Sequence, residues 1–498
     1  MLASDSGRWL LLVIVVVLVP RGTARSHVAL VTTDQEAEPL VLQLAQLLAE
    51  DHHVTAVLYN SSGVGPTGAV RVVRVPAAAS DPASRISWLD RWERYPLLAP
   101  DAVVASRVAG CGALRASSLL ADFRPDLVIS TLYLDDACLL GLLPDAPVIG
   151  LLPSPVGLPW VTYQLGGHYP VSRIPVHGYP LGDADFYARL GNGWRWWTLL
   201  RRVQRLYQTP VASGAGGHLD LEKAYDRVAA VYVSGDARLP AEVPADRRIR
   251  FLGCIECANF APLPKKLMST IGGGSLLVIR LHHPHVTLPA AFKVALAQGA
   301  ASSSLTPIDV SNATSADADR VIHSGVPAAD ALAHSRARVF ISECSASSVL
   351  LAVHFSVPLV CIPFTAGHKM AAANAVSLGL GVEVDRRSLT PESLRAAITS
   401  VTTSAGLRRA VRVRADALRH DAISPAAQFS HDVHHLLMFG GRPRRRRPLG
   451  LVEYYCLDVV GTCLVSGGLG AALLMLLFGW LFRVLSGRQG RDVKAKVE

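Results

Sequence analysis

The chain has 498 residues, half of them hydrophobic, and a formal net charge of +10. This length and composition allow two or three domains with a large core. Most of the excess charge flanks one apolar segment near the C-terminus, with Arg442 and Arg444 to Arg447 before it and a basic tail after Phe482. Because the remaining chain is close to neutral, composition argues against a nucleic-acid-binding surface.

Residues 1–24 have the pattern of a secretory signal peptide. Arg8 precedes an apolar run from Trp9 to Val19, and small residues follow up to Ala24. The run is too short to span a bilayer. We therefore expect cleavage near Ala24 and a body on the lumenal side of a membrane.

Residues 25–249 are predicted to form a first α/β domain. Its opening elements alternate as strand, helix and strand, which favours a parallel sheet. The segment from Pro153 to Pro180 is rich in glycine, proline and aromatic residues, and is expected to form long loops. The expected strands are 27–33, 52–59, 125–131, 146–152 and 228–235, with a helix at 39–50.

Residues 250–270 carry two prolines and few strong periodic signals, and are predicted to be an interdomain linker. Residues 271–440 then repeat the α/β pattern as a second domain. The sequence thus predicts an α/β protein with two doubly wound, Rossmann-like domains, which place a ligand cleft between them. The expected strands are 275–281, 337–342, 357–363 and 379–385, with helices at 391–420 and around 431–438.

The stretch from Phe340 to Phe364 reads as a buried strand, a tight turn, a short helix and a second buried strand. A strand–turn–helix unit of this kind often binds phosphate through backbone N–H groups. Its turn is Glu343-Cys344-Ser345, which has no glycine and places a carboxylate where an anion would bind.

The C-terminal region is predicted to be a membrane anchor. A basic juxtamembrane segment, 441–458, precedes 24 uncharged residues from Val459 to Phe482, which are long enough to span a bilayer. Residues 483–498 would form a cytosolic tail. Lys494 and Lys496 resemble a dilysine signal for retrieval to the endoplasmic reticulum, although they also fit a basic stop-transfer flank. These features predict a single-pass type I protein of the endoplasmic reticulum membrane, with N-glycosylation at the sequons of Asn60 and Asn312.

Cysteine and histidine patterns give little support for a metal site. Cys254 and Cys257 form a CxxC without a second ligand pair, so zinc is disfavoured, whereas a disulfide to another cysteine stays open. Cys344 and Cys361 have apolar strand surroundings and are interpreted as ordinary core residues. The HHxH motif of His282, His283 and His285 alternates over both faces of a strand end and is interpreted as lining a loop.

The order of several motifs resembles the UDP-glycosyltransferase family in its membrane-anchored, UDP-glucuronosyltransferase-like form. The motifs are "FLGCIEC", "PLPKKL", "HSRARVFIS", "SVPLVCIPF" and "YYCLDVVG", the last followed by the apolar segment. The resemblance implies a GT-B fold, with an N-terminal acceptor domain and a C-terminal donor domain. It also implies transfer of a hexose or glucuronate from a UDP-sugar to a small lipophilic acceptor.

The catalytic positions of the family are replaced in this chain. Family members use a histidine in the first strand-to-helix loop, oriented by an aspartate, to deprotonate the acceptor hydroxyl. Here Glu36 or Gln35 lies nearest to the histidine position, and Thr131 stands at the aspartate position. Asp135 and Asp136 are out of register and are interpreted as part of a solvated loop.

The donor positions differ further. The resemblance implies a tryptophan for uracil, a His-Gly-Gly turn for the diphosphate, a glutamate for ribose and an Asp-Gln pair for the sugar. Gly325 replaces the tryptophan, Glu343 the histidine of the turn, Leu351 the glutamate, and Gly367-His368 the Asp-Gln pair. The complete set of residues at family donor positions is Gly325, Ala328, Glu343, Cys344, Ser345, Ser347, Leu351, Gly367 and His368.

These replacements predict a pseudoenzyme, a fold-retaining relative that takes no cofactor and binds a lumenal protein or a small lipophilic ligand. Two alternatives remain open from sequence. One is an active UDP-glycosyltransferase with an altered donor site, and the other is an unrelated lumenal interaction glycoprotein.

Overall fold

The computed structural model describes most of both α/β halves and the C-terminal helix. The described residues are 25–59, 69–75, 110, 112–114, 123–133, 136–142, 146–167, 169–174, 176, 185–208, 224–236, 238–239, 246–281, 288–311, 313–314, 320–440, 452 and 456–494.

The first half contains a seven-stranded parallel sheet in the order β3-β2-β1-β4-β5-β6-β7. Its central strands are almost fully buried and rich in valine, isoleucine and leucine, as expected when helices cover both faces of a parallel sheet. The strands are β1 His27–Thr32, β2 His53–Tyr59, β3 Val70–Val75, β4 Leu127–Thr131, β5 Val148–Leu152, β6 Val228–Val233 and β7 Ile249–Phe251. The helices are α2 Glu38–Leu48, α4 Asp136–Leu142, α5 Leu158–Gln164 and α6 Phe186–Gln208, with a 3₁₀ turn η3 at Pro155–Gly157.

The second half contains a six-stranded parallel sheet in the order β10-β9-β8-β11-β12-β13. The strands are β8 Leu276–Arg280, β9 Thr306–Asp309, β10 Ile322–His323, β11 Ala337–Ser342, β12 Leu359–Cys361 and β13 Gly381–Glu383. The helices are α9 Lys265–Ile271, α10 Ala290–Ala301, α11 Ala328–Ala333, α12 Ala346–His354, α13 Ala366–Ser377, α14 Pro391–Thr403 and α15 Ala405–Arg419, with 3₁₀ turns η4 Glu256–Ala258 and η5 Arg386–Ser388.

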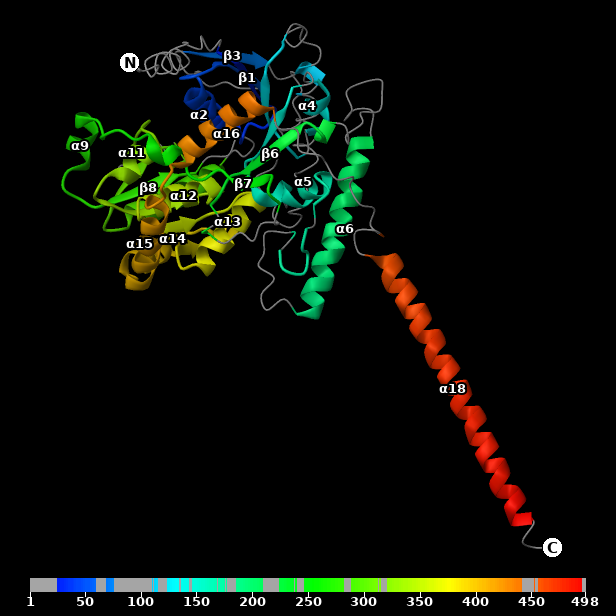
Figure 1. Cartoon of the computed structure of the whole chain (residues 1–498). Helices are drawn as coiled ribbons and strands as arrows, with labels where there is room; N and C mark the ends of the chain where they lie inside the picture. The colour runs from blue at the N-terminus through cyan, green and yellow to red at the C-terminus, as the bar shows by residue number, and fades with distance from the viewer. Residues whose placement is uncertain are drawn as a thin grey trace, which may run out of the picture.

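Helix α16, Pro425–Phe439, returns from the second half to the first and lies beside α2 (Figure 1). Phe429 and Val433 are buried in the same apolar cluster as the first sheet, and the Phe429 ring meets the Tyr232 ring edge to face. Asp432 accepts hydrogen bonds from Tyr232 and Arg250. The two halves are therefore held together by packing as well as by the chain between them.

Helix α18, Leu457–Lys494, extends away from both halves (Figure 1). Over Leu457–Arg483 it is long and apolar enough to cross a membrane, and none of its most apolar stretch is buried inside the protein. This agrees with the apolar segment predicted at 459–482.

The predicted fold class is confirmed, and every strand predicted from sequence is present. The structure adds β3, β9 and β10, which are short or interrupted by polar residues, and places β7 at the edge of the first sheet. The expectation of loops alone between Pro153 and Pro180 is wrong, because η3 and α5 lie there. Pro155 and Pro159 occupy the first turns of these helices, where proline is tolerated.

Candidate functional site in the interdomain cleft

A cavity of about 650 Å³ lies between the halves at the carboxyl ends of the strands, where open α/β sheets bind ligands. The first half contributes residues from the loop before α2, from α2 itself and from the β5 and β6 ends. The second half contributes residues from η4 and its flanks, from β8, from the start of α11, from the turn before α12, and from the first turns of α12, α13 and α16. The lining residues used below are Gln35, Glu36, Pro39, Leu40, Leu47, Glu50, Ile255, Glu256, Arg280, Ala328, Glu343, Ser345, Ser347 and His368.

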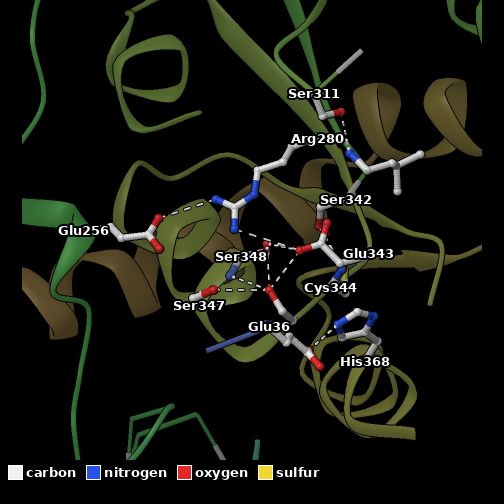
Figure 2. Close-up of polar contacts among 12 residues, drawn as sticks. Glu36, Glu256, Arg280, Ser311, Ser342, Glu343, Cys344, Ser347, Ser348 and His368 are labelled. Carbon is white, nitrogen blue, oxygen red and sulfur yellow. Dashed lines mark hydrogen bonds and ion pairs between the residues drawn. The ribbon is translucent and has the colours of Figure 1, made fainter. Parts of the chain in front are cut away.

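The turn between β11 and α12 holds the carboxylate of Glu343 at the N-terminus of α12. Ser345 is the N-cap of the helix, and its Oγ accepts a hydrogen bond from the Ser348 backbone N–H. Oε1 of Glu343 accepts a hydrogen bond from Ser345 Oγ at 3.0 Å. It accepts another from Ser348 Oγ at 2.9 Å (Figure 2). Because a helix N-terminus favours negative charge, this carboxylate occupies a position that suits an anion.

Cys344 adopts a left-handed backbone conformation with φ of 56° and is completely buried. This conformation favours glycine. A disulfide joins Cys344 to Cys361 on β12, so the interpretation of these cysteines as ordinary core residues is wrong. Cys254 and Cys257 are bonded to each other rather than to another cysteine.

Arg280, at the end of β8, lies between two carboxylates of the second half (Figure 2). Its Nη1 is 3.4 Å from Glu256 Oε2, and its Nη2 is 4.0 Å from Glu343 Oε1. Burial lowers the pKa of Arg280, but the charges of Glu343 and Glu256 outweigh this and hold the pKa above its usual value. The sequence patterns did not single out Arg280 or Glu256, because their contact depends on folding the η4 turn against β8.

Glu36 and His368 form a hydrogen bond between the two halves, with 3.0 Å between Glu36 Oε1 and His368 Nε2 (Figure 2). Glu36 precedes α2, and its backbone N–H bonds Asp34. His368 lies in the first turn of α13, which Thr365 caps, and only 3% of its surface is exposed. The residue nearest to the family's base position thus contacts a residue at the family's sugar-binding position.

The other residues at donor positions differ in their relation to the cleft. Ala328, Ser345 and Ser347 line it, as does Gln35 from the first half. Leu351 is fully buried in the core below α12 and cannot bind ribose. Space is open where a side chain at Gly325 would project.

Gly367 marks a close approach of the two halves. A Cβ atom added there would lie 2.4 Å from Oγ of Ser154. An aspartate at this position, as the family resemblance implies, would require the loop that carries Ser154 to move. The departure from the family pattern therefore matches the local packing.

On the acceptor side, Thr131 is buried and its Oγ1 is 3.1 Å from Thr32 Oγ1. Asp136 is not part of a solvated loop: it is fully buried and accepts hydrogen bonds from Trp160 Nε1 and the Tyr225 hydroxyl. Its role in this structure is to join α4, α5 and the segment before β6.

Several predicted positions lie outside the described residues, namely Asn60, Asp135, His282, His283, His285, Asn312 and Lys496. Lys494 is the last residue of α18. Among the described residues, no three His, Cys, Asp or Glu side chains are grouped so that they could hold a metal ion.

Comparisons with known proteins agree on one family. Residues 244–478 match the family described as UDP-glucoronosyl and UDP-glucosyl transferase. Human UDP-glucuronosyltransferase 3A1 is 23% identical over 371 residues, which cover 67% of this chain and 68% of that protein. Human 2-hydroxyacylsphingosine 1-beta-galactosyltransferase is 22% identical over 163 residues, covering 32% of this chain and 29% of that protein.

Solved structures show the same fold. The calicheamicin glycosyltransferase CalG4 aligns with a TM-score of 0.52 and 19% identity, covering 84% of this chain and 99% of that one. Os79 from O. sativa, in complex with U2F and trichothecene, aligns with a TM-score of 0.56 and 16% identity, covering 82% of this chain and all of that one. The family match and these relatives support a UDP-glycosyltransferase family member. The two parallel sheets and the solved structures show the GT-B glycosyltransferase fold.

Proposed function

We propose that this protein is a non-catalytic member of its family, which binds a ligand in the interdomain cleft and does not transfer sugar. The observation that carries the proposal is the Glu343 carboxylate at the N-terminus of α12, held by Ser345 and Ser348. In this interpretation, the protein's own anion occupies the place where the family binds a diphosphate.

Electrostatics oppose a diphosphate at this turn. Two like charges ~4 Å apart repel by about 4 kcal/mol at an effective dielectric constant of about 20. That energy corresponds to a factor of about 10³ in affinity. Arg280 offers little compensation, because Glu256 and Glu343 already neutralise it.

Among the described residues of the first half, those at the family's catalytic positions provide no evident catalytic base. Glu36 is already hydrogen-bonded to His368, and a general base must reach the acceptor hydroxyl directly or through one water. Thr131, at the family's orienting position, bonds Thr32 and carries no charge.

Ligand-dependent stability tests this proposal. The full-length protein in lipid nanodiscs is heated with UDP, UDP-glucose or UDP-glucuronate at millimolar concentration, and we expect no rise in melting temperature. A ligand at a hundredfold excess over its Kd would stabilise the folded state by about 2.7 kcal/mol, which is readily measured. A reproducible rise with any of the three overturns the proposal.

Glu343→Ala provides the matched variant, because it removes the anion and leaves the Cys344–Cys361 disulfide intact. We expect measurable UDP binding in Glu343→Ala. Restoring the complete His-Gly-Gly turn of the family would also replace Cys344 and break the disulfide. A change in UDP affinity could then not be separated from a change in folding.

The Glu36–His368 pair favours a second candidate function, that of an active transferase with a displaced base. A carboxylate that orients an imidazole is a common general-base arrangement. This candidate predicts turnover of a UDP-sugar with a phenolic acceptor such as 1-naphthol, lost in His368→Gln. Without turnover by the wild-type protein, this candidate fails.

We further propose that the protein is a single-pass glycoprotein of the endoplasmic reticulum membrane with a lumenal body. Helix α18 and the N-terminal apolar run support this topology. Glycosidase treatment of protein expressed in cultured animal cells should increase its electrophoretic mobility through Asn60 or Asn312. Lys494→Ala with Lys496→Ala should release it to later compartments. Unchanged mobility rejects the lumenal assignment, and unchanged localisation rejects the retrieval signal.

A further inference from the structure

We propose that the cleft binds an organic amine with an apolar body, whose ammonium group is held by Glu343. This inference rests on the proposed function, because the amine would occupy the space that a UDP-sugar donor fills in the family. Three features of the cleft indicate this chemical class of ligand: its acidic lining, a Glu343 carboxylate oxygen without a partner, and its apolar side chains.

The described lining of the cleft is acidic. Four carboxylates face it, those of Glu36, Glu50, Glu256 and Glu343, against one guanidinium, that of Arg280. The carboxylates come from separate parts of the chain: the loop before α2, the residues after α2, η4 and the turn before α12. An excess of negative charge in a partly enclosed site favours a cationic ligand and disfavours an anionic one.

Among these carboxylates, Glu343 is the one that we assign to binding the cation. The residue is 96% buried, since only 4% of its surface is exposed, and it lines the cleft. Its Oε1 contacts the two serine hydroxyls and Arg280, whereas its Oε2 has no hydrogen-bond partner in the described part of the chain. A buried carboxylate oxygen without a partner costs free energy. Because Oε2 has almost no exposed surface of its own, a ligand donor would reach it once the carboxylate turns toward the cleft.

A primary ammonium group matches the chemistry around Glu343. It carries three donors and no acceptor, and an ionic hydrogen bond to a carboxylate is stronger than a neutral one. The Ser347 hydroxyl lies 3.2 Å from Ser345 Oγ and also lines the cleft, so it can accept a second hydrogen bond.

The remaining wall accommodates an apolar body. Pro39, Leu40 and Leu47 line the cleft from the first half, and Ile255 and Ala328 line it from the second. The cavity of about 650 Å³ lies within the range of about 300–1,000 Å³ typical of small-molecule sites. Apolar side chains lie among the carboxylates of the lining, and this mixture favours an amphiphilic amine over an inorganic cation.

The experiment compares two probes of similar shape, 3-phenylpropylamine and the neutral 3-phenylpropan-1-ol. Binding to the full-length protein in nanodiscs is measured by calorimetry at pH 7, with empty nanodiscs subtracted to remove partition into lipid. We expect saturable binding of the amine, at least tenfold tighter than that of the alcohol. Equal affinities, or no binding of the amine, would overturn the inference without requiring any variant.

Glu343→Gln then tests the residue, with Glu392→Gln on the exposed first turn of α14 as the matched control. We expect Glu343→Gln to weaken amine binding at least tenfold and Glu392→Gln to leave it within a factor of two. Equal effects of the two variants would overturn the role of Glu343.

The nucleotide measurement separates this inference from the proposed function. If neither the amine nor UDP binds, the amine assignment is wrong and the non-catalytic proposal stands. If UDP binds, the proposed function is wrong. The amine assignment is then wrong as well, because it places the amine in the space that the UDP-sugar would fill.

Discussion

Two strand-to-helix turns face each other across the cleft, and each presents a carboxylate. The turn before α2 presents Glu36, whose side chain is 31% exposed and bonds His368 in the opposite half. The turn before α12 presents Glu343, whose side chain is 5% exposed and bonds the serines of its own helix. One carboxylate thus links the two halves, whereas the other belongs to the internal structure of one half.

This difference indicates which parts of the family's strand-turn-helix units this chain keeps and which it changes. Around Glu343, the strand, the helix and its N-cap are kept. The Glu343 carboxylate provides the negative charge that a helix N-terminus favours, so no bound anion is needed there. Around Glu36, the link to His368 depends on the spacing of the two halves. We therefore expect changes near Glu343 to affect stability strongly and changes near Glu36 to affect mainly the closure of the cleft.

Arg280→Leu should have the largest effect on stability. It removes the cation between Glu256 and Glu343 and leaves two largely buried carboxylates facing each other. Breaking a buried pair costs about 3–5 kcal/mol, and the partial exposure of Arg280 places this case near the lower end, at about 3 kcal/mol. Urea unfolding measures the loss. Arg280→Leu with Glu343→Leu should recover part of it, and a single-variant cost below about 1 kcal/mol contradicts the central role of Arg280.

Cys344→Ser with Cys361→Ser should have a similar or slightly smaller effect. The disulfide closes a loop with a sequence separation of 17, for which chain entropy predicts about 3 kcal/mol. The matched pair Cys254→Ser with Cys257→Ser closes a separation of only 3, for which the same relation gives about 2 kcal/mol. Thermal unfolding of the two double variants compares them. A larger loss from the Cys254–Cys257 pair would contradict the view that the Glu343 turn is the more constrained region.

Glu36→Gln and His368→Gln should have smaller effects on unfolding, about 1 kcal/mol each, as for a typical hydrogen bond. A double-mutant cycle with Glu36→Ala and His368→Ala isolates the pair, because each alanine variant alone removes the contact. Hydrogen exchange of the α13 N-terminus should rise in both variants if the contact holds the halves together. A coupling energy near zero would mean that the two residues act independently.

The sequence predicted the sheets better than the site, for a physical reason. Buried parallel strands such as β1, β4 and β11 are continuous apolar runs and can be recognised locally. The Glu36–His368 contact joins residues 332 positions apart, and the position of Arg280 between two carboxylates depends on how η4 packs on β8. Local patterns carry no information about such contacts, although the unusual Glu343 was visible in the turn itself.

The same reasoning applies to residues that were misinterpreted. Asp136 looked solvent-exposed because a charged pair in a loop is usually solvated, but α4 begins there and Trp160 and Tyr225 bury its carboxylate. Cys344 looked like an ordinary core residue because its partner Cys361 lies on the next strand. The correct interpretation of both residues required knowledge of the tertiary structure.

The smallest expected effect is a pH dependence at a contact between the halves that lies outside the cleft. Burial raises the pKa of Asp432 on α16, but hydrogen bonds from Tyr232, Arg250 and Gln428 outweigh it and hold the pKa below 3.8. A carboxylate with a lowered folded-state pKa stabilises the folded state above its unfolded pKa, and this stability is lost as the pH falls through the folded-state pKa. The contribution of Asp432 should therefore be complete at neutral pH and decline only below about pH 4.

The melting temperature of the wild-type protein and of Asp432→Asn, recorded from pH 7 to pH 3, measures this difference. The two curves should converge as the pH falls, because protonation of Asp432 makes the wild-type side chain neutral as well. A constant gap across the whole range would show that the Asp432 carboxylate contributes by shape rather than by charge.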